Sequence, residues 1–170
     1  MQTAEKQVLY DAAKPGDIFF SGDSGWTSKA IRYVLNFEYS HVFVKLDDKY
    51  IIESALGGVR INAAKKHITE LSTYFEFLSL PDKLDRDKFL ALLKEDVGKD
   101  YDYWLILGAI VSRIIRRHRQ QKGLADSLDK LVCSELIAKH LQNCDYKLPY
   151  PPSQMTPEDL YYLLRMKKER

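Results

Sequence analysis

Three side chains in this sequence have the chemistry of a nucleophilic catalytic site. Cys133 lies in the segment LVCSELIAKHL, whose spacing predicts a helix that begins just before it. The positive end of the helix dipole favours the thiolate, which is the reactive form of cysteine. His41 could accept the thiol proton, because imidazole titrates near neutral pH. Glu53 could orient that imidazole, and the three groups together would make a catalytic triad.

Each of these residues also has a purely structural interpretation. A cysteine among leucine and valine residues can be a small buried apolar side chain. A histidine at the start of a strand can simply be half exposed. Three other histidines are candidates for the base, namely His67, His118 and His140. Spacing alone therefore leaves both interpretations of Cys133 open.

The segment HVFVKLDDKYIIES (41–54) predicts a β-hairpin that sets the distance between His41 and Glu53. Its bulky residues with apolar bodies all carry even numbers: Val42, Val44, Leu46, Tyr50 and Ile52. Side chains alternate between the faces of a strand, so these residues share one face if the turn has an odd number of residues, such as three. His41 and Glu53 then lie on the opposite face, directly across or one diagonal step apart. A two-residue turn at Asp47-Asp48 would separate them.

A zinc site formed by Cys133, His140 and Cys144 is not expected. Their spacings of seven and four residues suggest one helix face. Seven residues of helix, however, separate Cys133 from His140 by about 10 Å. Zinc ligands lie about 2 Å from the ion, so both side chains cannot reach it. We therefore expect no metal and no other cofactor.

The rest of the sequence supplies the elements that must position these residues. Strands are expected within 18–20, 41–54, 59–61 and 75–80, and helices within 26–35, 87–97, 103–119 and 131–141. A last helix should follow Thr156, which can cap it, with Pro157 in the first turn. The expected strands lie mostly in the first half of the chain and the expected helices mostly in the second half. Strands and helices do not alternate as they do in folds with a parallel sheet. This order predicts an α+β fold with an antiparallel sheet.

Length and composition narrow the class of protein. The 170 residues predict a single domain, 1–170. The formal net charge of +2 gives no overall field for a nucleic acid, so no nucleic-acid partner is expected. Two cysteines exclude a disulfide framework. No signal peptide or membrane-spanning segment is recognisable, so we expect a protein that is cytoplasmic as synthesised, with delivery by a phage lysis system or a secretion machine left open.

The segment YWLILGAIVSRIIRRHRQQK (103–122) is apolar at its start and basic at its end. A helix of this kind can lie on an anionic membrane or cover an apolar substrate. It can also be a core helix whose last turn carries solvated cations, which are favourable at a helix C-terminus. The core helix is the favoured interpretation, and peripheral membrane contact stays open.

Six segments carry a resemblance to a known family: GDIFF (16–20), YSHVFV (39–44), YIIESALGGVRI (50–61), GKDYDY (98–103), VCSELIAKHL (132–141) and PPSQMTPEDL (151–160). In this order they resemble the circularly permuted branch of the NlpC/P60 papain-like superfamily, especially its YiiX/YebB-like cysteine hydrolases. The resemblance covers about residues 15–160. His41 and Glu53 precede Cys133, which is the permuted order, whereas non-permuted relatives place the cysteine first.

The resemblance implies a permuted papain-like fold in which the cysteine helix packs against a small antiparallel sheet. It also implies a cysteine hydrolase or acyl transferase that cleaves an amide or ester bond through a thioester. Cys133 would be the nucleophile, His41 the general base and acid, and Glu53 the residue that orients the imidazole. The backbone N–H of Cys133 would stabilise the oxyanion, and Tyr101 and Ser40 are candidates for a second donor.

The sequence leaves the substrate and two other functions open. Relatives act on peptide amides, on acyl lipids and on other esters, and nothing in the sequence chooses among them or between transfer and hydrolysis. The long segment 104–122 departs from the family pattern, which makes substrate inference from relatives unsafe. The chain could also be a non-catalytic binding module on the same fold, or a peripheral membrane protein that uses the helix at 103–122.

Overall fold

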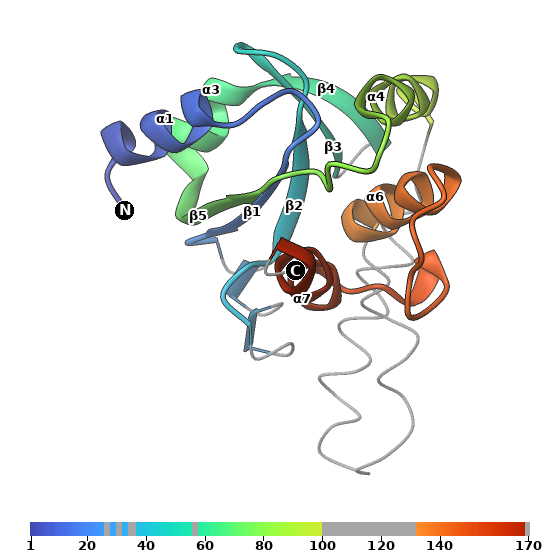
Figure 1. The fold of residues 1–170 in the computed structure, drawn as a ribbon. Coiled ribbons are helices and arrows are strands. Elements are labelled where there is room, and N and C mark those ends of the chain that lie inside the picture. The colour runs from blue at the N-terminus through green and yellow to red at the C-terminus, as the bar shows by residue number, and fades with distance from the viewer. Residues whose placement is uncertain (26–27, 30–31, 34–36, 56–57, 100–131, 169–170) are drawn as a thin grey trace, which may run out of the picture.

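The computed structural model describes residues 1–25, 28–29, 32–33, 37–55, 58–99 and 132–168. A five-stranded antiparallel sheet with strand order β4-β3-β2-β1-β5 lies at the centre of this part of the chain (Figure 1). Its strands are β1 (Ile18–Asp23), β2 (His41–Lys45), β3 (Tyr50–Ala55), β4 (Gly58–Ala63) and β5 (Ser72–Leu78). The expected α+β class with an antiparallel sheet is confirmed.

Helices cover both faces of the sheet (Figure 1). On one face lie α1 (Thr3–Ala12), α3 (Ala64–Lys66) and the π-helical turn η1 (His67–Leu71). On the other face lie α4 (Arg86–Glu95), α6 (Val132–Asn143) and α7 (Pro157–Lys168), with the short 3-10 turn η2 (Pro152–Gln154) before α7. The sheet is therefore the middle layer of three.

Because both faces are covered, the strands bury residues of both parities. Even-numbered residues such as Phe20 and Val44 join the larger core, together with Leu136 and Leu141 from α6 and Leu164 from α7. Odd-numbered residues join a smaller core with α1 and the segment around η1. The members of this second core are Tyr10, Ala13, Phe19, Phe43, Ile51, Ala64, Ile68 and Phe75. The face that carries the odd-numbered residues thus contributes some side chains to this smaller core and others, His41 and Glu53, to the candidate site.

The hairpin of β2 and β3 has the predicted three-residue turn. The backbone N–H of Leu46 donates to the carbonyl of Tyr50 at 2.9 Å, which leaves residues 47–49 in the turn. The Asp47 carboxylate accepts the backbone N–H groups of Lys49 and Tyr50, which fixes the turn. Of the even-numbered residues assigned to one buried face, Tyr50 is 45% exposed, because it lies at the end of its strand beside the turn.

Helix boundaries follow the expected capping chemistry. Asp85 accepts the N–H of Lys88 at the start of α4, and Gly98, just beyond that helix, has a φ of 86° that only glycine adopts easily. Thr156 accepts the N–H of Asp159, whose carboxylate accepts in return the N–H of Thr156, so the predicted start of the last helix is confirmed. In the predicted helix 26–35, the described residues 28–29 and 32–33 are helical. The expected helix 103–119 lies outside the described residues.

Helix α1 is an element that the sequence analysis did not predict, because its sequence is mostly polar. The hairpin turn holds it in place. The Tyr10 hydroxyl donates to the carbonyls of Asp47 and Tyr50 at 2.7 and 3.0 Å. In return, the buried Lys45 ammonium donates to the carbonyls of Tyr10 and Ala13 at 2.9 and 3.0 Å, at the C-terminal end of the helix. A tertiary contact, rather than local propensity, therefore defines α1.

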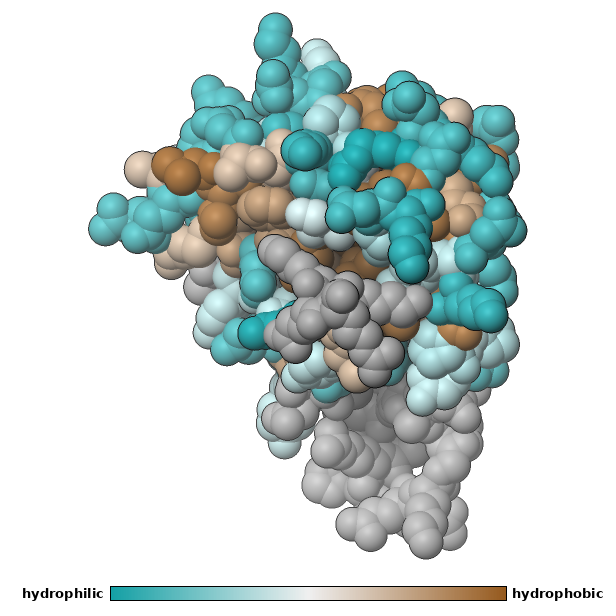
Figure 2. Space-filling model, in the orientation of Figure 1, coloured by the Kyte–Doolittle hydropathy of each residue, from teal (hydrophilic) through white to brown (hydrophobic). Residues whose placement is uncertain are grey.

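The surface reflects the one-sided docking of α1. Most residues on the face drawn in Figure 2 are hydrophilic, and a group of hydrophobic residues surfaces over α1. Val8 is 68% exposed there, whereas Tyr10 is fully buried against the sheet. Among the helices of the described residues, none has the length and hydropathy to cross a bilayer.

Replacing Lys45 by methionine should destabilise the fold by about 2–3 kcal/mol, because the terminal carbonyls of α1 would lose a buried cationic donor. Urea unfolding measures this change as a lower midpoint with an unchanged slope. Lys49→Met, at an exposed position of the same turn, is the matched control and should change stability by less than about 0.5 kcal/mol. Equal destabilisation by both substitutions would contradict the assigned role of Lys45.

Candidate active site

His41 and Glu53 meet on the odd-numbered face of the hairpin. His41 is the first residue of β2, and Phe43 lies directly opposite Glu53 of β3. His41 is therefore one diagonal step from Glu53, which is one of the two arrangements that the register predicted. Its Nε2 lies 2.8 Å from Oε2 of Glu53. Strand pairing alone brings the imidazole and the carboxylate together.

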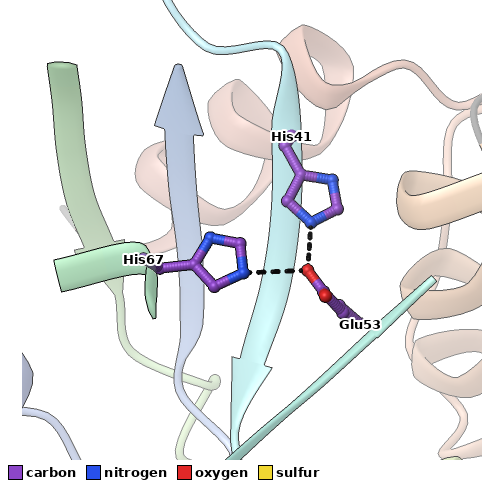
Figure 3. Close-up of side chains that lie close together, drawn as sticks. All are labelled: His41, Glu53 and His67. Atoms are coloured by element: carbon purple, nitrogen blue, oxygen red, sulfur yellow. Dashed lines mark hydrogen bonds and ion pairs between the residues drawn. The ribbon is translucent and has the colours of Figure 1, made fainter. Parts of the chain in front are cut away.

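A second imidazole shares the same carboxylate oxygen. Nε2 of His67 lies 3.0 Å from Oε2 of Glu53, and the rings of His67 and His41 are nearly parallel with centroids 5.8 Å apart. Figure 3 shows Glu53 between the two rings. His67 begins η1, which returns along the sheet face after β4. From the sequence, His67 is only a competing candidate for the base, since no local spacing relates η1 to the hairpin.

The other oxygen of Glu53 is held by the neighbouring strand. The Asn62 side-chain amide donates to Oε1, and the Arg60 guanidinium donates to the same oxygen at 3.4 Å. Glu53 is only 4% exposed. Burial raises the pKa of its carboxyl, but hydrogen bonds from His41 and His67 and their charge outweigh burial and hold that pKa well below its usual range. The carboxylate is therefore ionised and fixed in orientation.

Cys133 lies on α6, the helix that packs on β2 and β3. It is the second residue of α6, close to the helix start as the sequence predicts, and it is buried. Burial lowers the pKa of His41, whereas hydrogen bonding and charge interactions with Cys133 and then with Glu53 raise it, to about 10. The thiol and the carboxylate thus both favour the protonated form of this imidazole.

The packing of α6 fixes the position of that thiol. The Ser134 hydroxyl, next in sequence, donates to the carbonyl of Met155 at 2.7 Å and is fully buried. Leu136, Ile137 and Leu141 of the same helix lie in the larger core. The residues that follow Cys133 in α6 are therefore anchored by the segment after η2 and by the core.

The remaining residues singled out from the sequence lie elsewhere or outside the described part. Ser40 directly precedes His41 and is buried, with its hydroxyl 2.5 Å from the hydroxyl of Ser28. Nε2 of His140 donates to the Asp96 carboxylate at 2.9 Å, in a separate cluster between α4 and α6. Tyr101, His118 and the segment 103–122 lie outside the described residues.

One group of side chains in the described part of the chain has the composition and closeness of a metal site. It consists of His41, Glu53 and His67, whose ligand atoms all lie within 4.8 Å of one another. Cys133, His140 and Cys144, which the sequence analysis considered and rejected as zinc ligands, are not members of it. Helix geometry excludes a zinc site at those three residues but gives no information about ligands on the face of the hairpin.

Comparison with known proteins agrees with the architecture. No protein-family model matches the chain. Over 77 residues it is 35% identical to the probable lipoprotein peptidase YaeF of Escherichia coli K12, a match that covers 45% of this chain and 28% of YaeF. The crystal structure of the metalloprotein YiiX from Escherichia coli O157:H7 aligns with a TM-score of 0.52 and 23% identity, over 78% of this chain and 66% of YiiX. The fold is therefore similar to that of YiiX.

The YiiX-like fold explains why the candidate residues converge although they are distant in sequence. The first strand of the hairpin carries the histidine, the second the acid, and a late helix that packs on β2 and β3 carries the cysteine. The resemblance inferred from the six sequence motifs is confirmed at the level of the fold. The chain spans about a quarter of YaeF, 28% of its length, and somewhat less than two thirds of YiiX, 66%.

The raised pKa of His41 predicts an alkaline titration. Because its pKa is about 10 rather than 6.5, the imidazole should remain protonated through neutral pH. The stability that this group contributes is then complete below pH 6.5 and is lost as the pH rises through about 10. NMR titration of the ring protons, assigned with His41→Gln, measures the midpoint.

Glu53→Gln should lower that midpoint, since one of the interactions that raises the pKa is lost. His140→Gln changes a histidine in the separate Asp96 cluster and should leave the midpoint of His41 where it is. A wild-type midpoint near 6.5 would contradict the described site.

Proposed function

We propose that this chain is a cysteine-dependent hydrolase of the papain-like type, which cleaves an amide bond through a thioester. Cys133 is the nucleophile, His41 the general base and acid, and Glu53 the residue that orients the imidazole. The observation that carries this proposal is the 2.8 Å hydrogen bond between His41 and Glu53, with Cys133 at the start of the helix that packs on the same two strands. Interactions with Cys133 and Glu53 both raise the pKa of that imidazole. The YiiX-like fold and the peptidase name of YaeF support it.

The acylation step uses the two ring nitrogens of His41 differently. Nε2 is bound to Glu53, so Nδ1 exchanges the proton with the thiol. The Cys133 thiolate attacks the substrate carbonyl, and an S–C bond forms. His41 then protonates the leaving nitrogen as the C–N bond breaks, which releases the amine and leaves the acyl group on the sulfur.

The deacylation step returns the site to its starting state. His41, now neutral, takes a proton from a water molecule, whose oxygen attacks the thioester carbonyl. The S–C bond breaks, the acid product leaves, and the thiolate and imidazolium form again. An amine or alcohol in place of water would give transfer instead of hydrolysis by the same proton movements.

Stabilisation of the oxyanion is assigned to donors beside the thiol. The backbone N–H of Cys133 lies in the first turn of α6, where N–H groups have no partner within the helix. Ser40 and Tyr101 stay candidates for the second donor. Ser40 is adjacent to His41, and its hydroxyl, close to that of Ser28, would have to rotate toward the substrate.

A peptide is the substrate class that we favour, because the named relative YaeF is a probable peptidase. Acyl-lipid and other ester substrates use the same thioester chemistry and are the alternatives. Contact of the segment 103–122 with a membrane is a separate proposal, which liposome co-sedimentation of Arg116→Glu/Arg117→Glu against the wild type tests.

A panel of peptidyl and acyl electrophilic probes tests both the chemistry and the substrate class. Wild-type protein should be labelled at Cys133, most rapidly by the peptidyl probes, and Cys133→Ala should not be labelled there. Cys144→Ala is the matched control, since that cysteine is buried in the larger core and should leave labelling at Cys133 unchanged.

His41→Ala should slow turnover of a probe substrate by about 10²- to 10⁴-fold, which is the usual contribution of a general acid–base group. Glu53→Gln should slow it less, because its amide can still contact the imidazole. Labelling of Cys133 at the same rate in wild type and His41→Ala would favour a binding module with an inert thiol and would overturn the proposal.

A further inference from the structure

We propose that His41, Glu53 and His67 form a binding site for a divalent transition-metal ion such as zinc, and that a bound ion blocks the reaction of Cys133. The first part rests on the three side chains alone. The second part rests on the proposed function, because it concerns the proton that His41 exchanges with the thiol.

The three side chains supply a ligand set that zinc uses in proteins. Two imidazole nitrogens and one carboxylate oxygen, with a further position left open, make up a known three-ligand zinc site. Both Nε2 atoms face the same oxygen of Glu53, at 2.8 Å from His41 and 3.0 Å from His67. Ligands of a tetrahedral zinc ion are about 3.4 Å apart. The three ligand atoms lie within 4.8 Å of one another, so opening the two contacts with Glu53 by about half an ångström and adjusting the spacing of the two rings would admit the ion.

The surroundings fix the carboxylate in the orientation that such a site needs. Asn62 and Arg60 hold Oε1 of Glu53, so Oε2 points at the two histidines (Figure 3). Partners of this kind orient ligands in metal sites and strengthen binding. The Arg60 guanidinium opposes a cation by its charge, but it is 41% exposed and solvent screens it in part.

The site also has a route for entry and a clear preference among cations. His67 and Glu53 are buried, whereas the His41 side chain is 23% exposed and gives access from the surface.

Imidazole ligands favour zinc, copper, nickel and cobalt, and disfavour magnesium and calcium, which prefer oxygen ligands. We therefore expect binding of Zn²⁺ and Co²⁺ and none of Mg²⁺ at the same concentration.

The consequence for Cys133 follows from the two nitrogens of the imidazole. A metal ion on Nε2 of His41 replaces the proton there, so the ring proton of the neutral imidazole sits on Nδ1. Nδ1 then cannot accept the thiol proton, and Glu53 is engaged by the metal. The ion therefore disables the base without binding to the sulfur.

Equilibrium dialysis against Co²⁺ or Zn²⁺, followed by elemental analysis, tests the site without any measure of activity. Wild-type protein should bind one equivalent, and Co²⁺ should give visible bands without the intense near-ultraviolet band of a cobalt–thiolate bond. Binding should be the same in Cys133→Ala. It should weaken at least tenfold in His67→Gln, whose amide can still donate to Glu53 but is a poor ligand for these ions.

His140→Gln is the matched control, because His140 is also buried and bonded to a carboxylate, and it should bind as the wild type does. Circular dichroism shows that each variant is folded. Absence of metal uptake by the wild type, uptake unaffected by His67→Gln, or a cobalt–thiolate band lost in Cys133→Ala would overturn the site.

Alkylation by iodoacetamide, mapped by peptide mass, tests the second part with Cys144 as an internal reference. One equivalent of Zn²⁺ should slow alkylation of Cys133 at least tenfold in the wild type and much less in His67→Gln. Metal uptake without slower alkylation would overturn the blocking role. Slow alkylation of Cys133 in metal-free protein would instead count against the proposed hydrolase and leave the uptake result unaffected.

Discussion

A buried carboxylate, that of Glu53, is the constraint on which the candidate site depends. An ionised group with almost no exposure to water is unfavourable unless donors replace its hydration. Here the donors come from three different elements: His41 on β2, Asn62 and Arg60 on β4, and His67 on η1. The contacts with His41, Asn62 and Arg60 require the pairing of β2, β3 and β4 in one register. The Glu53 carboxylate therefore links the hairpin to its neighbouring strand β4 and to the turn η1 that follows.

The same constraint links the two faces of the sheet. The odd-numbered side chains of β2 and β3 form the smaller core near the turn and the charged cluster at the opposite end of the strands. The even-numbered side chains pack against α6 in the larger core, which fixes the start of that helix. Cys133 stands at this start, and its interactions raise the pKa of His41. In the proposed site, the thiol and the carboxylate act on one imidazole because both cores are packed against the same two strands.

Sequence reasoning could predict what depends on strand periodicity and helix capping. Because the apolar residues of the hairpin carry even numbers, its turn had to contain an odd number of residues. This turn length placed His41 and Glu53 on one face of the sheet. The Thr156–Asp159 capping pair similarly gave the start of α7. Helix α1 and the place of His67 were not predictable in this way. Both depend on contacts between elements distant in sequence, from Lys45 to the end of α1 and from Glu53 to η1, and no spacing along the chain records them.

Nε2 of His41 can carry either a proton or a metal ion, but not both. The proposed catalytic state and the proposed metal-bound state therefore exclude each other. Both states require Glu53 to be ionised. A ¹³C NMR titration of the Glu53 side-chain carboxyl measures this most directly. We predict that the carboxyl stays ionised well below its ordinary pKa of 4.5, so that the stability it contributes is present above pH 4.5 and is lost only as the pH falls far below it. A carboxyl that takes up its proton at or above pH 4.5 would contradict the account.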